Sequence, residues 1–253
     1  MEMKKHELDE RRTLFLPGNH DATLKFAVEH WVNTANEAIA KRGRFTVALS
    51  GGSTPKKIFQ ELSTNFKKKV DWSRVYLFWS DERSVPPTDK DSNYHMAMEE
   101  GGLKNLLIPK DHIFRMAAEN ELEKHAALYQ KKIQEHVPNA SFDLVMLGMG
   151  DDGHTASLFP HTEGVHVKGQ LVTPNHVPQK DTWRMSFTFD CINNAQNICL
   201  YVLGANKSEI LAKVLTSPLD KEAYPSQGVG SKEHKACWII DEEASKNLLV
   251  SLK

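Results

Sequence analysis

The sequence predicts a three-layer α/β fold in which a mostly parallel sheet is flanked by helices. Short apolar runs rich in β-branched and aromatic residues alternate with longer stretches that repeat apolar residues at helical spacing, and this alternation is typical of such folds. Several of the short runs are apolar on both faces, as strands in a covered parallel sheet are. We expect one domain over residues 1–253, because no internal repeat, low-complexity segment or long Gly/Ser linker divides the chain.

Six runs are predicted to form strands, because each is short, apolar and bounded by polar or turn-forming residues. They are residues 45–50 (FTVALS), 75–80 (VYLFWS), 144–148 (LVMLG), 185–189 (MSFTF), 198–203 (ICLYVL) and 238–240 (WII). Residues 113–116 (IFRM) are a further candidate.

Five stretches between these strands are predicted to be helices. The longest covers residues 21–42, where apolar residues recur on a broad face and Asp21 is the expected N-cap. The others are residues 55–62, 93–100, 119–136 and 207–215. The segment 160–183, which contains Pro174, is expected to be mainly loop. The resulting order of strands and helices is Rossmann-like.

The charge balance argues against nucleic acid or a membrane as a partner. Lys and Arg number 32 and Asp and Glu 33, for a formal net charge of -1, so no global field attracts a polyanion. We interpret the run 67–69 (KKK) as a solvated helix end. No apolar run approaches the length of a membrane span, and the N-terminus lacks the apolar core of a signal peptide.

Cysteine usage indicates a reducing compartment. Cys191, Cys199 and Cys237 are widely spaced in the sequence, and they form no CxxC pattern. Zinc sites and disulfide frameworks usually show characteristic cysteine spacing, so the sequence argues against both. We therefore expect a soluble, cytoplasmic protein.

Three polar loops follow predicted strands and are expected to form one pocket. The strand 45–50 runs into SGGSTP, the strand 75–80 into DERSVP, and the strand 144–148 into MGDDGHT. Ligands of open α/β sheets bind outside the carboxyl ends of the strands. Asp81 and Arg83 in the second loop, and Asn93 after it, could line a wall of this pocket, although an isolated acid–arginine triplet is more often solvated.

The first loop has the features of a phosphate cradle. It follows a strand and opens a helix, its two glycines allow close approach of the backbone, and free N–H groups at a helix start attract anions. It matches neither GxxxxGK[ST] nor GxGxxG, so no nucleotide is implied. A tight turn that needs glycine for its geometry alone is an equal alternative. The residues concerned are Ser50, Gly51, Gly52, Ser53 and Thr54.

His154 is the predicted catalytic base. It follows a glycine at a strand end and has two acids close by, Asp151 and Asp152. A carboxylate can select the tautomer of an imidazole and raise its basicity, and either aspartate is placed to do so. A metal site is the rival interpretation, but no HxH or HExxH spacing is present.

Two cations at separate strand ends point to a bound anion. Arg184 precedes the run 185–189, and Lys207 follows the run 198–203 at the expected start of a helix. A basic residue in the first turn of a helix is unfavourable to the helix dipole. An anion between the two cations and the first loop would account for it.

These motifs resemble those of the 6-phosphogluconolactonases, within the larger group that also holds glucosamine-6-phosphate deaminases. The matching segments, in order, are LSGGSTP, SDERSVP with a following SNY, FDLVMLGMGDDGHTASLFP, WRMSF, VLGANK and WIID. The resemblance spans about residues 45–244. Two places depart from the family pattern: residues 224–227 read YPSQ in place of a PAQ-like segment, and residues 161–163 read HTE.

The resemblance implies hydrolysis of 6-phospho-D-glucono-1,5-lactone to 6-phosphogluconate, the second step of the oxidative pentose phosphate pathway. It implies that His154 takes the proton of the attacking water, that Asp152 orients His154, and that Arg83 neutralises negative charge near the carbonyl or the sugar hydroxyls. No metal or organic cofactor is expected, because an ester carbonyl is already electrophilic. The implied 6-phosphate contacts are Ser50, Gly51, Gly52, Ser53, Thr54, Arg184 and Lys207.

Two alternatives remain open on the sequence. Deaminase/isomerases of amino-sugar phosphates carry a pattern like DGHIAFNEP, with an acid just before the proline, and here that position is Phe159. A non-catalytic phosphosugar-binding protein would usually carry a DNA-binding module, and no basic helix-turn-helix pattern is present. The expected partner is therefore a small phosphosugar lactone, bound by a monomer or a small homo-oligomer.

Overall fold

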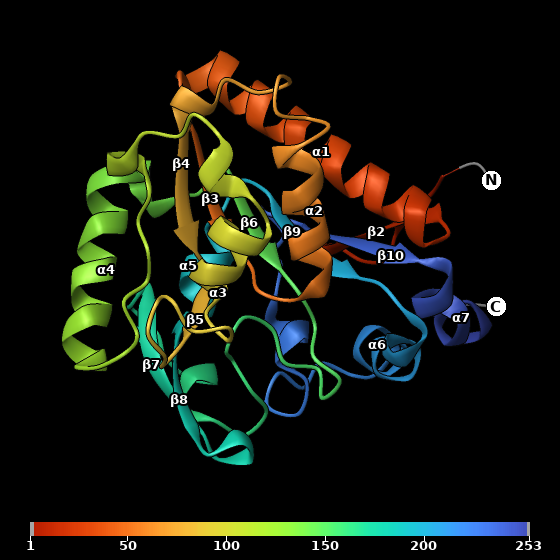
Figure 1. The fold of residues 1–253 in the computed structure, drawn as a ribbon. Helices are drawn as coiled ribbons and strands as arrows, with labels where there is room; N and C mark the ends of the chain where they lie inside the picture. The colour runs from red at the N-terminus through yellow and green to blue at the C-terminus, as the bar shows by residue number, and fades with distance from the viewer. Residues whose placement is uncertain (1–2, 252–253) are drawn as a thin grey trace.

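The computed structural model describes residues 3–251 and contains a seven-stranded main sheet (Figure 1). Every neighbouring pair of strands in it is parallel except β1 with β2. Helices flank this sheet, which confirms the predicted fold class. In order across the sheet, the strands are β1 (Lys4–Glu7), β2 (Arg12–Gly18), β10 (Ala236–Asp241), β9 (Ile198–Val202), β6 (Leu144–Leu147), β3 (Phe45–Leu49) and β4 (Val75–Trp79).

The helices include two packed pairs, α1 with α2 and α6 with α7. The described residues include α1 (His20–Arg42), α2 (Ser53–Ser63), α3 (Asn93–His95) with a π-helical turn (Met96–Glu100), α4 (Leu122–His136), α5 (Phe189–Asn193), α6 (Ser208–Thr216) and α7 (Glu242–Ser251). Helix α1 packs on α2 and contacts β2, β3 and β10, whereas α6 packs on α7 (Figure 1). No helix within residues 3–251 is long and apolar enough to span a lipid bilayer.

The strand predicted at residues 185–189 lies in a second sheet. It is β8 (Thr182–Phe187), and it pairs antiparallel with β5 (Asp81–Arg83) on one side and β7 (Val172–Val177) on the other. Strand β7 was expected to be loop because it contains Pro174. Proline cannot donate to a ladder but is tolerated on an edge strand, and β7 is such an edge.

Several element ends differ from the prediction for local reasons. Asn19, not Asp21, caps α1, because its side chain accepts a hydrogen bond from the Ala22 N–H at 3.0 Å. Residues 113–116 make only an isolated bridge between Ile113 and Leu77. Lys207 lies in a 3-10 turn directly before α6 and not inside its first turn. Strands β1 and β2 were not predicted; β1 is exposed throughout and carries no apolar pattern.

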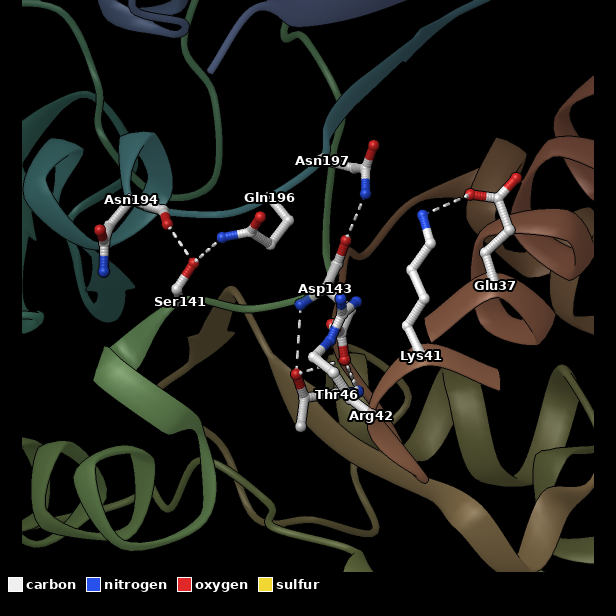
Figure 2. A network of polar contacts seen from close by, with 9 residues as sticks. All are labelled: Glu37, Lys41, Arg42, Thr46, Ser141, Asp143, Asn194, Gln196 and Asn197. Carbon is white, nitrogen blue, oxygen red and sulfur yellow. Dashed lines mark hydrogen bonds and ion pairs between the residues drawn. The ribbon is translucent and has the colours of Figure 1, made fainter. Parts of the chain in front are cut away.

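A buried carboxylate ties together the amino ends of β3 and β6 (Figure 2). Asp143 Oδ2 accepts hydrogen bonds from the Thr46 N–H at 2.7 Å and the Thr46 hydroxyl at 3.0 Å. Its other oxygen accepts from the Arg42 guanidinium, with Nε at 2.8 Å. Because Arg42 ends α1, this contact joins a helix and two neighbouring strands. The polar loops that follow β3 and β6 leave the opposite, carboxyl ends of the same strands.

Candidate functional site

A cavity of about 310 Å³ opens at the carboxyl ends of the central strands, where β5 and β8 of the second sheet meet the main sheet. All the predicted site residues line it except Asp151 and Asp152. The lining consists of Ser50, Gly51, Gly52, Ser53, Thr54, Pro55, Asp81, Arg83, Asn93, Gly148, Met149, Gly150, His154, Ala156, Arg184, Tyr201, Leu203, Asn206 and Lys207. The predicted convergence of the three loops is therefore confirmed.

A larger cavity of about 640 Å³ lies beside the π-helical turn and α4, with Met98, Leu103 and Ile108 among its lining residues. None of the three polar strand-end loops contributes to it. It carries no grouping of an acid and a base, so the smaller, polar cavity is the candidate site.

The loop after β3 presents a helix start to the cavity. Gly52 has a φ of 105°, in the left-handed region that favours glycine, and no side chain caps the N-terminus of α2. A Cβ on Gly51 would lie 2.0 Å from Asn93 Oδ1, so only glycine leaves room for that amide. The uncapped N–H groups and the positive end of the helix dipole favour an anion here.

Two arginines lie next to each other on adjacent strands of the second sheet. Arg83 on β5 and Arg184 on β8 are direct partners in the antiparallel ladder. Each has a buried Nε with no hydrogen-bond partner among the described residues. Burial lowers the pKa of Arg184, the neighbouring Arg83 lowers it further, and Asp81 opposes both effects. Two adjacent guanidinium groups with free donors are suited to bind an anion between them.

Buried acids hold the wall that carries these arginines. Asp81 accepts a hydrogen bond from the Ser157 hydroxyl at 2.7 Å and lies 3.3 Å from Asn93 Nδ2. Glu82 accepts the Asn93 N–H at 2.7 Å and the Tyr94 N–H at 2.9 Å. Burial raises the pKa of Glu82, and these N–H contacts counteract the shift. Glu82 was not among the predicted site residues, although its place in the DER motif could have indicated it.

His154 is held by Asp152 and by an aromatic ring. The ring Nδ1 of His154 lies 2.5 Å from Asp152 Oδ1, and the backbone N–H of His154 donates to the same oxygen at 3.1 Å. Burial alone would raise the pKa of Asp152, but the hydrogen bonds from His154 outweigh it and bring the pKa to about 2. The imidazole stacks on Phe159, with centroids 3.9 Å apart. Nε2 is then the ring nitrogen left for chemistry.

The second aspartate of the motif has a different contact. Asp151 Oδ1 lies 2.5 Å from Lys207 Nζ and 3.3 Å from Asn206 Nδ2. Its side chain is 72% exposed, whereas that of Lys207 is 21% exposed. Asp151 thus balances the charge of Lys207 from outside the cavity, and only Asp152 contacts His154.

Some lining residues could not have been found from sequence. Tyr201 lies inside the apolar strand β9, and Met149 and Ala156 carry no chemical signal. Gly150 has a steric role, because a Cβ there would lie 2.0 Å from His154 Nδ1. Among residues 3–251, the three side chains whose possible metal-ligand atoms lie close together are His30, Cys199 and Cys237, and all three lie outside this lining.

Comparison with known proteins places these features in a family context. Residues 18–238 match the model of a family described as glucosamine-6-phosphate isomerases/6-phosphogluconolactonase. A protein of Chlamydia pneumoniae named 6-phosphogluconolactonase is 42% identical over 222 residues, 87% of this chain and 84% of the relative. The crystal structure of 6-phosphogluconolactonase from Thermotoga maritima superposes with a TM-score of 0.78 at 26% identity, covering 90% of this chain and 99% of that one.

A monomeric glucosamine-6-phosphate deaminase shares the fold with a TM-score of 0.78 at 16% identity, covering 92% of this chain and 99% of that one. At this identity the likeness concerns the fold alone. The two activities that the family name joins therefore have to be distinguished by the residues of the cavity.

Proposed function

Because this chain belongs to the glucosamine-6-phosphate isomerase/6-phosphogluconolactonase family, we infer that it is a 6-phosphogluconolactonase. It hydrolyses 6-phospho-D-glucono-1,5-lactone to 6-phosphogluconate, in the oxidative pentose phosphate pathway. The observation that carries the assignment from the structure is the His154–Asp152 pair in a cavity lined by Arg83, Arg184 and Lys207. A base beside a set of cations suits a substrate that is both an ester and a phosphate.

In the proposed mechanism, His154 acts through Nε2. Asp152 accepts the hydrogen bond of the Nδ1 proton, which leaves Nε2 free to take a proton from water. The water oxygen forms a bond to lactone C1, and the carbonyl electron pair moves onto its oxygen. Asp152 stabilises the imidazolium that forms, as a carboxylate beside a general base does.

The second half of the reaction returns the proton. The oxyanion collapses, the bond from C1 to the ring oxygen breaks, and His154 gives its proton to that leaving oxygen. The new carboxylic acid ionises, so one proton is released to solvent for each lactone opened. We propose that Arg83 stabilises the developing oxyanion, because its side chain lines the same cavity as His154.

The 6-phosphate is proposed to bind at the other cations. Arg184 and Lys207 line the same cavity as the uncapped start of α2 at Ser53 and Thr54. The charge of Lys207 is already balanced by Asp151, so Arg184, whose Nε has no hydrogen-bond partner among the described residues, is expected to contribute more. Backbone N–H groups and the helix dipole complete the phosphate site.

The structure gives a physical reason against deaminase chemistry. That reaction would need an acid at the position of Phe159, which here is a ring stacked on the imidazole of His154 and only 1% exposed. An apolar ring in van der Waals contact with the base cannot relay a proton to a ring oxygen.

The deciding experiment is lactone hydrolysis followed by proton release in weak buffer, with the spontaneous rate subtracted. We expect enzyme-dependent proton release from the 6-phospholactone and no ammonia from glucosamine 6-phosphate. Ammonia release would favour the deaminase. Tight binding of the phosphosugar without any turnover would favour a non-catalytic binding protein.

A further inference from the structure

Two cysteines and a histidine that lie far apart in the sequence come together on the main sheet. Cys199 on β9 and Cys237 on β10 are direct partners in the parallel ladder. His30 lies in α1, the helix that packs on β10. One possible ligand atom from each of the three side chains lies within 4.8 Å of the others. The absence of a CxxC motif therefore did not exclude a cluster of thiols in space.

The cluster is closed toward the core and open toward solvent. Cys199 is fully buried, whereas Cys237 and His30 are partly exposed. A cavity of about 210 Å³ is lined by both His30 and Cys237. Lys5 and Lys235 also line it, and each pairs with Glu7 at 2.9 Å. The single negative charge of Glu7 offsets one of these two positive charges, which reduces the repulsion of an incoming cation.

The donor set selects one class of ligand. Nδ1 of His30 is buried and has no hydrogen-bond partner among residues 3–251, although buried polar atoms nearly always have one. A bound ion is one of the physical explanations for such an atom. Two sulfur atoms and an imidazole suit thiophilic ions of the Zn²⁺ type and do not suit Mg²⁺ or Ca²⁺, which take oxygen ligands.

We propose that Cys199, Cys237 and His30 bind a thiophilic metal ion such as Zn²⁺, with water as a fourth ligand. Zn–S and Zn–N bonds of about 2.0–2.3 Å in a tetrahedron place ligand atoms about 3.5–3.8 Å apart. Side-chain movement of about 1 Å is enough to reach this spacing from the separations present. Each thiol loses its proton to solvent, and the two thiolates balance the charge of the ion.

A bound ion would connect α1 to the centre of the main sheet. His30 belongs to the helix, whereas the two sulfur ligands belong to neighbouring strands. An ion that binds the folded chain and not the unfolded chain stabilises the fold by mass action. Zn²⁺ should therefore raise the midpoint of thermal unfolding, and this effect should not depend on catalysis by His154.

Co²⁺ titration of the reduced full chain tests the site, because thiolate–Co²⁺ coordination absorbs in the near ultraviolet. We expect one equivalent to bind with the spectrum of a tetrahedral thiolate site. Cys237→Ser and His30→Gln should each weaken binding by at least about tenfold. Cys191→Ala is the matched control, because it removes a buried thiol on α5 that lies outside the cluster. It should leave binding unchanged.

Thermal unfolding with and without Zn²⁺ provides the second measurement. The midpoint should rise for wild type, Cys191→Ala and His154→Asn, and should not rise for Cys237→Ser. If wild type shows no thiolate–Co²⁺ absorption, or if Cys191→Ala loses it as fully as Cys237→Ser, the proposal is wrong. Because His154→Asn is expected to bind the ion and to lack turnover, failure of this proposal and failure of the proposed enzyme activity are distinguishable.

Discussion

Replacing Arg184 by alanine should separate phosphate binding from lactone chemistry. Arg184 is half-buried, lines the cavity and has an Nε without a hydrogen-bond partner among the described residues. A charge-assisted hydrogen bond to a phosphate from such a position is worth about 1.5–3 kcal/mol. Its loss therefore lowers kcat/KM about ten- to a hundredfold on the 6-phospholactone. Part of the loss should fall on kcat, because the phosphate holds C1 in place against water and His154.

The same substitution should not unfold the protein. The lowered pKa of Arg184, caused by burial and then by Arg83, means that the fold disfavours the charged guanidinium at every pH below its pKa. Removing that charge relieves first the cost of burying it and then its repulsion by Arg83, while some packing over Phe159 is lost. The two effects oppose each other, so we expect the midpoint of thermal unfolding to stay within about 5 °C of wild type.

Lys180→Ala is the matched control for this experiment. Lys180 Nζ also lies 5.9 Å from the centre of the Phe159 ring, as the Arg184 guanidinium does, but Lys180 is not among the lining residues. The assay is kcat/KM on the 6-phospholactone and on unphosphorylated gluconolactone for all three proteins. The phosphate assignment would be refuted if Arg184→Ala lost the same factor in kcat/KM on both lactones. It would also be refuted if Lys180→Ala lost as much kcat/KM on the 6-phospholactone as Arg184→Ala does.

The catalytic histidine, the buried Asp143 and the carboxylate beside His154 each give a further prediction. His154→Asn should keep the fold and lose about a hundred- to ten-thousandfold in kcat; near-normal turnover in the proton-release assay would show that another group is the base. Asp143→Ala should lower the free energy of unfolding by about 2–4 kcal/mol, because it leaves the Thr46 N–H without its partner. Lys41→Ala, which breaks an exposed ion pair nearby (Figure 2), should cost less than about 1 kcal/mol when the unfolding of both variants is measured by urea titration; similar losses in the two variants would contradict the argument. The pKa of Asp152 of about 2, below its ordinary 3.8, means that its carboxylate stabilises the fold fully above about pH 4 and that this contribution is lost as the pH falls toward 2. Urea unfolding of Asp152→Asn should lack that part of the pH dependence, and an unchanged profile would show that the pair contributes nothing.

The local sequence determined which segments form five strands of the main sheet, β3, β4, β6, β9 and β10, and where the chemistry of the sheet lies. Runs such as 45–50 and 198–203 are apolar on both faces, and only a covered parallel sheet buries both. The carboxyl ends of parallel strands share one edge, so the order of strand and polar loop was enough to predict that Ser50, Arg83 and His154 meet. The family motifs then distinguished a lactonase from other phosphosugar proteins. That residues 1–253 form one domain stays a prediction.

The tertiary structure decided the contacts that depend on neighbours remote in the chain. Strand β2 pairs with β10, more than two hundred residues later, and no local pattern encodes that choice. Asp151 and Asp152 are adjacent and chemically identical, and only the folded loop shows that Asp151 contacts Lys207 whereas Asp152 contacts His154. Spacing rules for metal ligands apply to one segment of chain. They could not reveal that the thiols on β9 and β10 lie close together, because the ladder that makes Cys199 and Cys237 neighbours exists only in the folded sheet.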